Sequence, residues 1–190
     1  MVKRIVIFAS GAGSNAENII QHFKSDSRVY IAGVCSNKAD AGVLKIAVRH
    51  EVERLVFSKE ELVGSSKVDD FLRLVAPDLI VLAGFLLKFP DRLVSGYEGA
   101  IINLHPSLLP KYGGKGMYGQ RVHEAVVAAG ESESGITIHY VNNQYDEGAI
   151  IAQYSCRLSI DDTPISLQKK IKGLEGQYFP ATIEKLLHNS

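Results

Sequence analysis

Cysteine is scarce in this chain of 190 residues, which contains only Cys35 and Cys156. Both lie in apolar runs typical of strands, which argues against the disulfide framework of small secreted domains. The pattern favours buried thiols in a reducing compartment. We therefore expect a cytoplasmic protein.

Net charge is also absent, because 21 Lys and Arg residues balance 21 Asp and Glu residues. No global field attracts nucleic acid or an anionic membrane surface, so any anion must be held by a local group of donors. We expect small-molecule substrates, with neither nucleic acid nor membrane as a partner.

Long apolar stretches and linkers are missing as well. The apolar residues 5–9 are too few for the core of a signal peptide, and no later run approaches a membrane span. With 46% hydrophobic residues, the length suits one well-buried core, so we expect a single domain over residues 1–190. The sequence leaves a monomer and a homodimer both open.

Short apolar runs alternate with helical patterns through the first two thirds of the chain. The runs that predict strands are residues 3–9, 29–35, 54–57, 79–83 and 100–104. Helices are predicted after the glycine-rich turn that follows the first run, over 41–50 and over 68–75, whereas 59–66 look like a polar connection. These βαβ units predict a Rossmann-like α/β fold, a mostly parallel twisted sheet with helices on both faces.

The last third has a different pattern. Residues 134–141 and 150–158 alternate like an antiparallel pair of strands, and the loop between them contains Asp146. A helix is predicted over 123–129. A C-terminal helix opens at Thr163-Pro164, and its glycine and proline residues predict a break near Gly176 and Pro180.

The end of the fifth predicted strand carries Asn103 and His105. Side chains at i and i+2 of a strand point to the same face, so both can reach one ligand. Pro106 stiffens the backbone at His105. An amide donor beside an imidazole suits the oxyanion of an acyl transfer. These two residues alone favour the structural interpretation, a strand-end Asn that caps a turn and a His bonded to backbone, so the rest of the chain must decide.

Residues 10–15 form a glycine-rich turn between the first strand and the first helix. Backbone N–H groups of such a turn can hold a phosphate at a helix N-terminus. Ala16 stands where the dinucleotide fingerprint has its third glycine, and the lysine of a Walker loop is missing. A phosphate cradle and a plain structural turn both remain open, and the position at a strand end favours the cradle.

Two further loops have unusual compositions. Residues 84–90 are apolar and follow the most uniformly apolar strand, which suits an aromatic cofactor ring but also a loop folded back into the core. Residues 113–119 are rich in glycine. They can form a lid, with Lys111 and Lys115 retaining an anion, or a plain surface loop.

Seven motifs, taken together, resemble the folate-dependent formyltransferases, and among them the branch that formylates phosphoribosylglycinamide in purine synthesis. The similarity runs from Ile5 to about Leu187. The motifs are Gly11-Ala-Gly-Ser-Asn15, Ser36-Asn-Lys-Ala-Asp40, Ala76-Pro-Asp78, Leu82-Ala-Gly-Phe85, Asn103-Leu-His-Pro-Ser-Leu-Leu-Pro110, Gly135-Ile-Thr-Ile-His139 and Asp146-Glu-Gly148.

The resemblance implies a role for each group of motif residues. Asn103, His105 and Asp146 are the implied catalytic residues. The implied donor of the formyl group is 10-formyltetrahydrofolate, used as a cosubstrate, and no metal is implied. The implied contacts to substrate phosphate come from Gly11, Gly13, Ser14 and Asn15, that to ribose from Glu175, and those to the pterin ring from Leu86, Leu87, Lys88 and Phe89, largely through backbone groups.

Three features depart from many relatives. Leu87 stands where a basic residue is common, which puts any side-chain contact there in doubt. The loop over 113–119 is longer and richer in glycine. Lys172 occupies a position that is often polar but uncharged.

The resemblance and the residues together predict direct transfer of a formyl group to an amine through a tetrahedral intermediate. No Ser or Cys beside an evident base stands in these motifs, which argues against an acyl-enzyme. We expect Asn103 and His105 to stabilise the oxyanion, while Asp146 sets the protonation state of His105 and assists removal of the amine proton. Gly148 is expected to let the loop of Asp146 turn sharply.

Other functions remain as alternatives. The first is hydrolysis of the same folate, with water in place of the amine. Formylation of initiator tRNA needs a basic surface and a further domain, which the neutral charge and the length do not favour. A nucleotide-binding module explains the glycine turn but not Asn103, His105 and Asp146 together.

Overall fold

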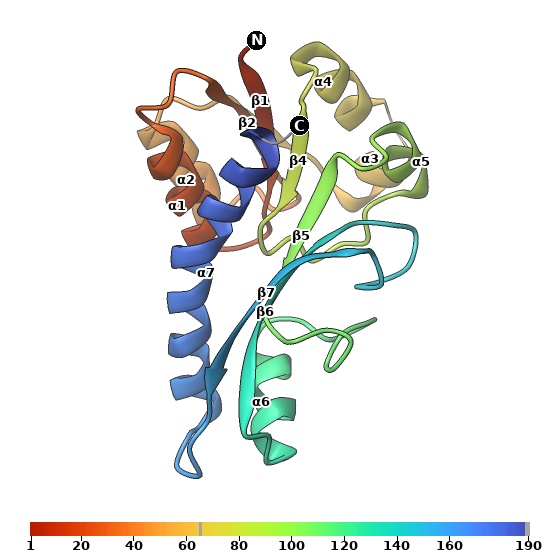
Figure 1. Ribbon diagram of the computed structural model, residues 1–190. Coiled ribbons are helices and arrows are strands. Elements are labelled where there is room, and N and C mark those ends of the chain that lie inside the picture. Colours follow the sequence, from red (N-terminus) through yellow and green to blue (C-terminus); the bar gives the residue numbers. More distant parts are fainter. Residues whose placement is uncertain (65, 189–190) are drawn as a thin grey trace. The chain divides into compact units, whose positions relative to one another are not determined.

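A computed structural model describes residues 1–64 and 66–188 (Figure 1). Its strands form a seven-stranded sheet of order β3-β2-β1-β4-β5-β6-β7, which confirms the predicted α/β fold class. Contacts divide the chain into two compact units, Met1–Ile102 and Asn103–Ser190, and strand β5 (Ile101–His105) contains the boundary. The single domain expected over residues 1–190 stays a prediction.

The first unit is built of parallel βαβ elements, and the predicted strands and helices are confirmed to within two residues. β1 pairs in parallel with both β2 and β4, and β2 pairs in parallel with β3. The elements are β1 (Lys3–Phe8), α1 (Ser14–Phe23), β2 (Val29–Ser36), α2 (Gly42–Arg49), β3 (Arg54–Val56), α3 (Lys59–Gly64), α4 (Lys67–Val75), β4 (Leu79–Leu82) and α5 (Asp91–Gly96).

The strand order of this unit reverses between β1 and β4. The chain runs outward from β1 through β2 to β3 and then returns to pair β4 with the other edge of β1. Because crossovers between parallel strands are right-handed, the reversal moves the following helices to the opposite face. Figure 1 shows α1 and α2 on one side of these strands and α3, α4 and α5 on the other. The loops that leave β1 and β4 therefore flank the switch point, where open α/β sheets bind ligands.

The core of the first unit lies along the two central strands. Ile5 and Ile80 are fully buried, as are most of their neighbours in β1 and β4. Helix α1 buries Ile19 and Phe23 at helical spacing. Each such side chain contributes roughly 1.5–3 kcal/mol when fully buried, so these strands hold the loops at their ends on a stiff base.

The polar connection expected over 59–66 is wrong. Ser58 and Glu61 form a reciprocal capping box, in which each backbone N–H donates to the side chain of the other at 2.7 and 3.1 Å. Leu62 is fully buried, so helix α3 forms here despite its polar composition. Ser65, part of the same expectation, lies outside the described residues. Helix α5 follows Pro90 and was not predicted.

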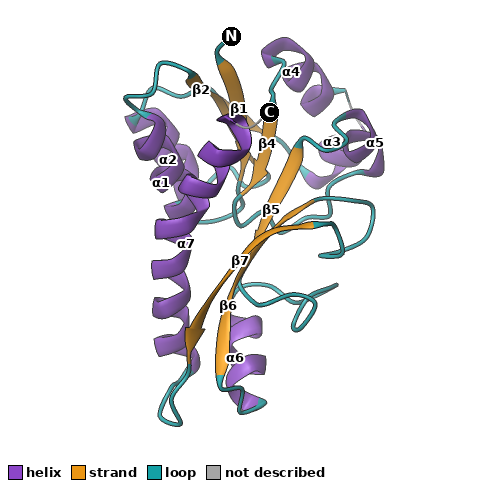
Figure 2. Ribbon diagram, viewed as in Figure 1, coloured by secondary structure: helices purple, strands orange, loops and turns teal. Residues whose placement is uncertain are grey.

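The second unit contains the predicted antiparallel pair, β6 (Glu133–Tyr140) and β7 (Ile150–Arg157), with Ile136 opposite Tyr154. Helix α6 (Gln120–Ala128) begins three residues before the predicted range. Helix α7 (Pro164–His188) begins at the predicted position and continues as one helix (Figure 2).

The break predicted near Gly176 and Pro180 is therefore wrong. A proline inside a helix removes one hydrogen bond, here to the carbonyl of Gly176, and costs about 3 kcal/mol. Packing offsets this cost, because Phe179 and Ile183 are fully buried on the same stretch. Tyr178 also stacks on Tyr154, with 3.9 Å between the ring centroids.

Both cysteines are free thiols, and burial raises the pKa of each. Cys35 is fully buried, as expected, whereas Cys156 is half-buried on β7, the last strand in the sheet order. Among the helices of residues 1–64 and 66–188, none is both long and apolar enough for a membrane span.

Candidate active site

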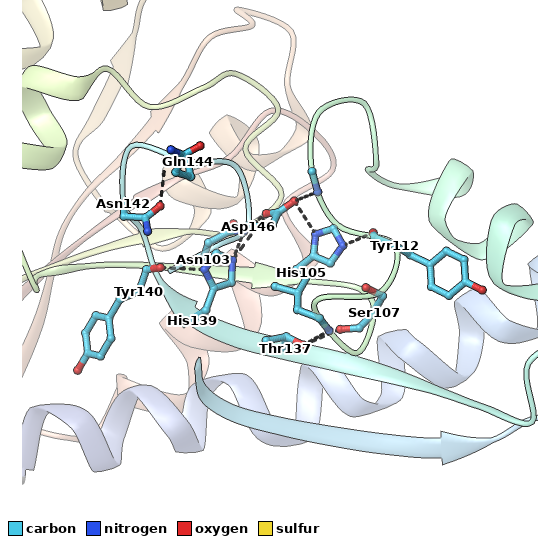
Figure 3. A network of polar contacts seen from close by, with 12 residues as sticks. Asn103, His105, Ser107, Tyr112, Thr137, His139, Tyr140, Asn142, Gln144 and Asp146 are labelled. Carbon is cyan, nitrogen blue, oxygen red and sulfur yellow. Dashed lines mark hydrogen bonds and ion pairs between the residues drawn. The ribbon is translucent and has the colours of Figure 1, made fainter. Parts of the chain in front are cut away.

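Four polar side chains of the second unit converge on one another (Figure 3). Asn103 and His105 come from β5, His139 from β6 and Asp146 from the loop between β6 and β7. The carboxylate of Asp146 lies between the two imidazoles, with Oδ2 3.6 Å from His105 Nδ1 and Oδ1 3.7 Å from His139 Nε2. The three residues predicted to be catalytic are thus neighbours in space.

The imidazole of His105 is held at both nitrogens. Nε2 lies 2.8 Å from the carbonyl oxygen of Tyr112, and since a carbonyl can only accept, Nε2 carries the proton of this contact. Nδ1 is thereby turned toward Asp146. His105 is 4% exposed. It has the bond to backbone that the structural interpretation predicted and also the neighbouring carboxylate that the catalytic interpretation predicted.

His139 is a member of this group that the sequence reasoning left without a role. Its Nδ1–H donates to the carbonyl of Tyr140 at 2.8 Å, which leaves Nε2 as an acceptor 3.1 Å from the amide nitrogen of Asn103. Burial is the main cause that lowers the pKa of His139, and nearby His105 lowers it further, against the opposing effects of Tyr140 and Asp146. The neutral ring therefore fits its role as an acceptor.

A signal for His139 was present in the sequence. Thr137 and His139 alternate with Ile136 and Ile138 along one predicted strand, so the two polar side chains share a face of that strand. Both are buried in the structure. A buried polar pair on one strand face marks a site as clearly as Asn103 and His105 do.

The amide of Asn103 has one orientation that satisfies its neighbours. Nδ2 donates to His139 Nε2 at 3.1 Å and lies 3.5 Å from Asp146 Oδ1. The reverse orientation places the amide oxygen against the carboxylate, which is repulsive. The proton facing Asp146 makes the longer contact, and it is the one that a ligand oxygen can take over.

Asp146 depends on two close approaches of the backbone. Its own φ is 56°, in the left-handed region that Asp tolerates, and the N–H of Gly114 donates to Oδ2 at 2.8 Å. A Cβ at Gly148 would lie 1.7 Å from the carbonyl oxygen of Tyr140. Gly148 is thus required for space, whereas its expected role was a sharp turn.

The glycine-rich loop over 113–119 supplies the Gly114 donor. Gly114, Gly116 and Gly119 have φ of 93°, 90° and 54°, which side chains other than glycine rarely adopt. The loop therefore does more than connect two elements, since its backbone helps to hold Asp146. Its predicted alternative role as a lid stays a prediction.

A second set of bonds holds the segment that follows His105. Thr137 Oγ1 donates to the carbonyl of Ser107 at 2.7 Å, and Ser107 Oγ donates to the carbonyl of Lys111 at 2.7 Å. The next residue, Tyr112, has a left-handed φ of 57°, and its hydroxyl donates to Glu131 at 2.9 Å. These contacts fix the carbonyl group of Tyr112, which accepts the hydrogen bond from His105 Nε2.

The glycine turn of the first unit begins α1 without a side-chain cap, and its role as a phosphate site stays a prediction. Gly13 caps α1 with φ of 88° and provides no side chain to pair with the N–H groups of the first helical turn. A Cβ on Gly13 would lie 2.7 Å from Val43. Glu17, the acidic residue in this turn, is paired with Arg49 at 3.0 Å, which offsets its negative charge.

The apolar loop over 84–90 is partly folded back into the core, whereas its role toward an aromatic cofactor ring stays a prediction. Phe85 and Phe89 pack edge-on against Phe8, with centroids 5.5 and 5.1 Å apart, so the loop is anchored in the core. Leu86 between them is 44% exposed, and Lys88 is exposed as well. Phe89 is buried.

Glu175, predicted to bind ribose, is half-buried in the middle of α7. Lys172 is exposed on the same helix, and after burial its charge is the second cause that lowers the pKa of buried His123. Throughout the described part of the chain, no group of three or more His, Cys, Asp or Glu side chains is arranged to hold a metal ion.

Comparison with known proteins agrees with this geometry. The formyl transferase family profile matches residues 3–183. Phosphoribosylglycinamide formyltransferase of Haemophilus influenzae is 35% identical over 96% of this chain and 86% of its own length. The crystal structure of the enzyme of the same name from Anaplasma phagocytophilum superposes with a TM-score of 0.90 at 32% identity, over 98% of this chain and 87% of that one.

A chloroplastic relative is longer. Phosphoribosylglycinamide formyltransferase of Arabidopsis thaliana is 40% identical over 89% of this chain, which spans only 60% of that protein's length. A family profile that covers nearly all of the sequence, together with the grouping of Asn103, His105 and Asp146, leads to one conclusion. The chain belongs to the formyl transferase family.

Proposed function

We propose that this protein transfers a formyl group from 10-formyltetrahydrofolate to the amine of 5-phosphoribosylglycinamide, a step of purine biosynthesis. The observation that carries the proposal is the buried group of Asn103, His105 and Asp146, in which an amide, an imidazole and a carboxylate meet. The relatives of this chain that are named phosphoribosylglycinamide formyltransferase support the choice of substrate.

The amine nitrogen attacks the formyl carbon, and the carbonyl oxygen gains a full negative charge in the tetrahedral intermediate. Asn103 Nδ2 donates to this oxygen by giving up its 3.5 Å contact to Asp146. In its imidazolium form, His105 donates to this oxygen from Nδ1, which lies 3.6 Å from Asp146, while Nε2 stays bonded to Tyr112. One well-placed donor stabilises such an oxyanion by roughly 3 to 4 kcal/mol. The intermediate then collapses, the bond from carbon to the folate nitrogen breaks, and that nitrogen takes up a proton.

Asp146 acts on the proton that the attacking amine loses. Its carboxylate accepts this proton directly or through one water molecule, as a general base does. The negative charge also lies 3.6 Å from His105 Nδ1, where it pairs with the imidazolium form of that ring. His139 keeps the Asn103 amide oriented from the other side.

The first unit is proposed to bind the non-reacting parts of both substrates. Backbone groups of Gly11, Gly13, Ser14 and Asn15 hold the phosphate at the N-terminus of α1. Backbone groups of Leu86, Leu87, Lys88 and Phe89 meet the pterin ring. In the second unit, Glu175 binds the ribose.

The proposed reaction uses no metal, because these side chains supply both the donors and the base. The protein is proposed to act as a monomer or homodimer in the cytoplasm. The cytoplasmic location stays a prediction from the two free cysteines, since the Arabidopsis relative is chloroplastic.

An assay of the purified protein tests the reaction class. We expect tetrahydrofolate to appear only when 10-formyltetrahydrofolate and phosphoribosylglycinamide are both present, together with one equivalent of the formylated amide. Release of tetrahydrofolate and formate without the amine would favour the hydrolase alternative. If the protein transfers the formyl group neither to the amine nor to water, both the transferase and the hydrolase function are contradicted.

A second experiment tests the pterin site. A folate analogue soaked into crystals is expected to contact residues 86–89. Density for the pterin ring at the turn over 11–15 would reverse the assignment of the two loops.

A further inference from the structure

Ser10 stands at the switch point of the first unit, two residues after the end of β1. It is 2% exposed, and three hydrogen bonds surround it. Its hydroxyl donates to Asn37 Oδ1 at 2.6 Å and accepts the N–H of Leu86 at 3.0 Å. Its own N–H donates to the carbonyl of Gly84 at 3.1 Å. Ser10 therefore connects the end of β1, the end of β2 and the loop after β4.

The directions of these bonds follow from the groups involved. A hydroxyl has one proton, and the amide oxygen of Asn37 takes it. The lone pairs of Ser10 Oγ are then free to accept from Leu86. If the Asn37 amide were reversed, its NH₂ group would face Oγ, and the hydroxyl proton would lose its acceptor. In the relay Asn37–Ser10–Leu86, as we name these three residues, the Ser10 hydroxyl thus has a partner both as donor and as acceptor.

Asn37 belongs to the Ser36–Asp40 motif, for which neither the family resemblance nor the proposed chemistry supplies a role. Ser36 Oγ accepts the N–H of Lys38 at 3.3 Å, which holds the turn that carries Asn37. Ser36 is fully buried, and Asn37 is half-buried. The motif therefore presents a fixed acceptor to Ser10.

Leu86 is the residue of the 84–90 loop on which this bond acts. Phe85 and Phe89 anchor the two sides of the loop on Phe8, and the exposed Leu86 lies between them. Aromatic packing fixes position but does not determine which way a peptide group points. The bond to Ser10 turns the Leu86 N–H inward and so orients the neighbouring peptide groups.

We propose that Ser10, oriented by Asn37, is a positioning residue that sets the backbone of the formyl-donor loop over 86–89. This inference rests on the proposed function, because it takes that loop as the pterin site. Removing the hydroxyl leaves the Leu86 N–H without its partner while the backbone bond from Ser10 to Gly84 remains. The loss is therefore confined to binding of the folate and spares binding of phosphate.

The test compares Ser10→Ala and Asn37→Ala with Ser166→Ala. Ser166 is a matched control, since its hydroxyl also donates, to Asp162 Oδ1 at 2.7 Å, and accepts, from the N–H of Thr163 at 2.9 Å. Titration calorimetry with a folate analogue that lacks the formyl group is expected to show roughly tenfold weaker binding for Ser10→Ala, a smaller loss for Asn37→Ala and none for the control. The affinity for inorganic phosphate stays within about twofold.

Amide hydrogen exchange separates this inference from the proposed function. In the protein without ligand, the Leu86 N–H is expected to exchange faster in Ser10→Ala than in the wild type, while amides of β1 do not change. Wild-type protein that fails to bind any folate would refute the proposed pterin site, yet the exchange rate would still test the relay. An unchanged Leu86 rate, or equal losses of folate and phosphate affinity, would overturn the inference. Should Ser10→Ala fail to fold, Asn37→Ala is read in the same way.

Discussion

The two units of this protein use different parts of the chain at their candidate sites. In the first unit the proposed ligand groups are backbone groups, those of the turn at Gly13 and those of the anchored loop over 86–89. In the second unit they are side chains, and His105, His139 and Asp146 are packed with little exposure. A site made of backbone tolerates changes such as Leu87 in place of a basic residue. A site made of buried side chains tolerates none, because each atom has a particular partner.

The side-chain site gives the largest expected effect. Asp146→Asn is predicted to lower kcat by about two to four orders of magnitude, since an amide cannot accept the amine proton. The Michaelis constants of both substrates should change little, because the variant keeps the shape of the residue. Steady-state kinetics beside Glu147→Gln, an exposed neighbour, provide the control. Near-native turnover in Asp146→Asn would remove the carboxylate from the mechanism.

Gly148→Ala extends the comparison to the backbone that supports this side chain. The new Cβ would lie 1.7 Å from the Tyr140 carbonyl, so the loop of Asp146 must move. A displacement of about 1 Å at a catalytic group costs on the order of 100-fold in kcat. Gly173→Ala on α7 is the control, since its Cβ meets nothing within 4 Å, and it should raise the free energy of unfolding by up to about 1 kcal/mol. Equal kinetics for the two variants would mean that the loop of Asp146 accommodates a Cβ at Gly148 without displacing the carboxylate.

The backbone site of the first unit should respond in a different parameter. Gly13→Val places a β-branched side chain at φ of 88° and against Val43, which distorts the turn before α1. We expect the Michaelis constant of the amine substrate to rise by about tenfold or more, with that of the folate nearly unchanged. Gly96→Ala on α5, with open space around its Cβ and no positive φ, should behave like the wild type. Equal increases for both substrates would argue against a phosphate site in this turn.

The smallest effect concerns pH and the free energy of unfolding. The pKa of His139 is lowered below its usual 6.5, mainly by burial. As pH falls through 6.5, the unfolded chain binds a proton that the folded chain does not. The contribution of neutral His139 to the free energy of unfolding is therefore fully present above pH 6.5 and declines below it. His139→Gln should reduce this decline in urea unfolding measured from about pH 7.5 to about pH 5.5. A remainder is expected from His123, whose pKa is also lowered. An identical decline in the variant would show that His139 is not neutral in the folded protein.

The outcome of the fold prediction depended on the range of the interactions involved. Apolar runs located β1, β2 and β4 because burial on both faces leaves a plain pattern in the sequence. Helix α3 was missed because one buried residue, Leu62, and a two-residue capping box stabilise it. The predicted break in α7 failed because tertiary packing of Phe179 and Ile183 outweighs the local cost of Pro180.

The sequence alone determined the strand that carries Asn103 and His105, since alternation and the following proline are local properties of the chain. It also placed glycine where α1 begins and where the loop of Asp146 ends. Only the tertiary structure decided that His139 orients Asn103, that the Tyr112 carbonyl accepts a hydrogen bond from His105 and that the Ser10 hydroxyl accepts one from Leu86. These partners are 7 to 76 residues apart in the chain. Hydrogen bonds require contact within about 3 Å, and no local pattern encodes which distant residues the packing will bring to that distance.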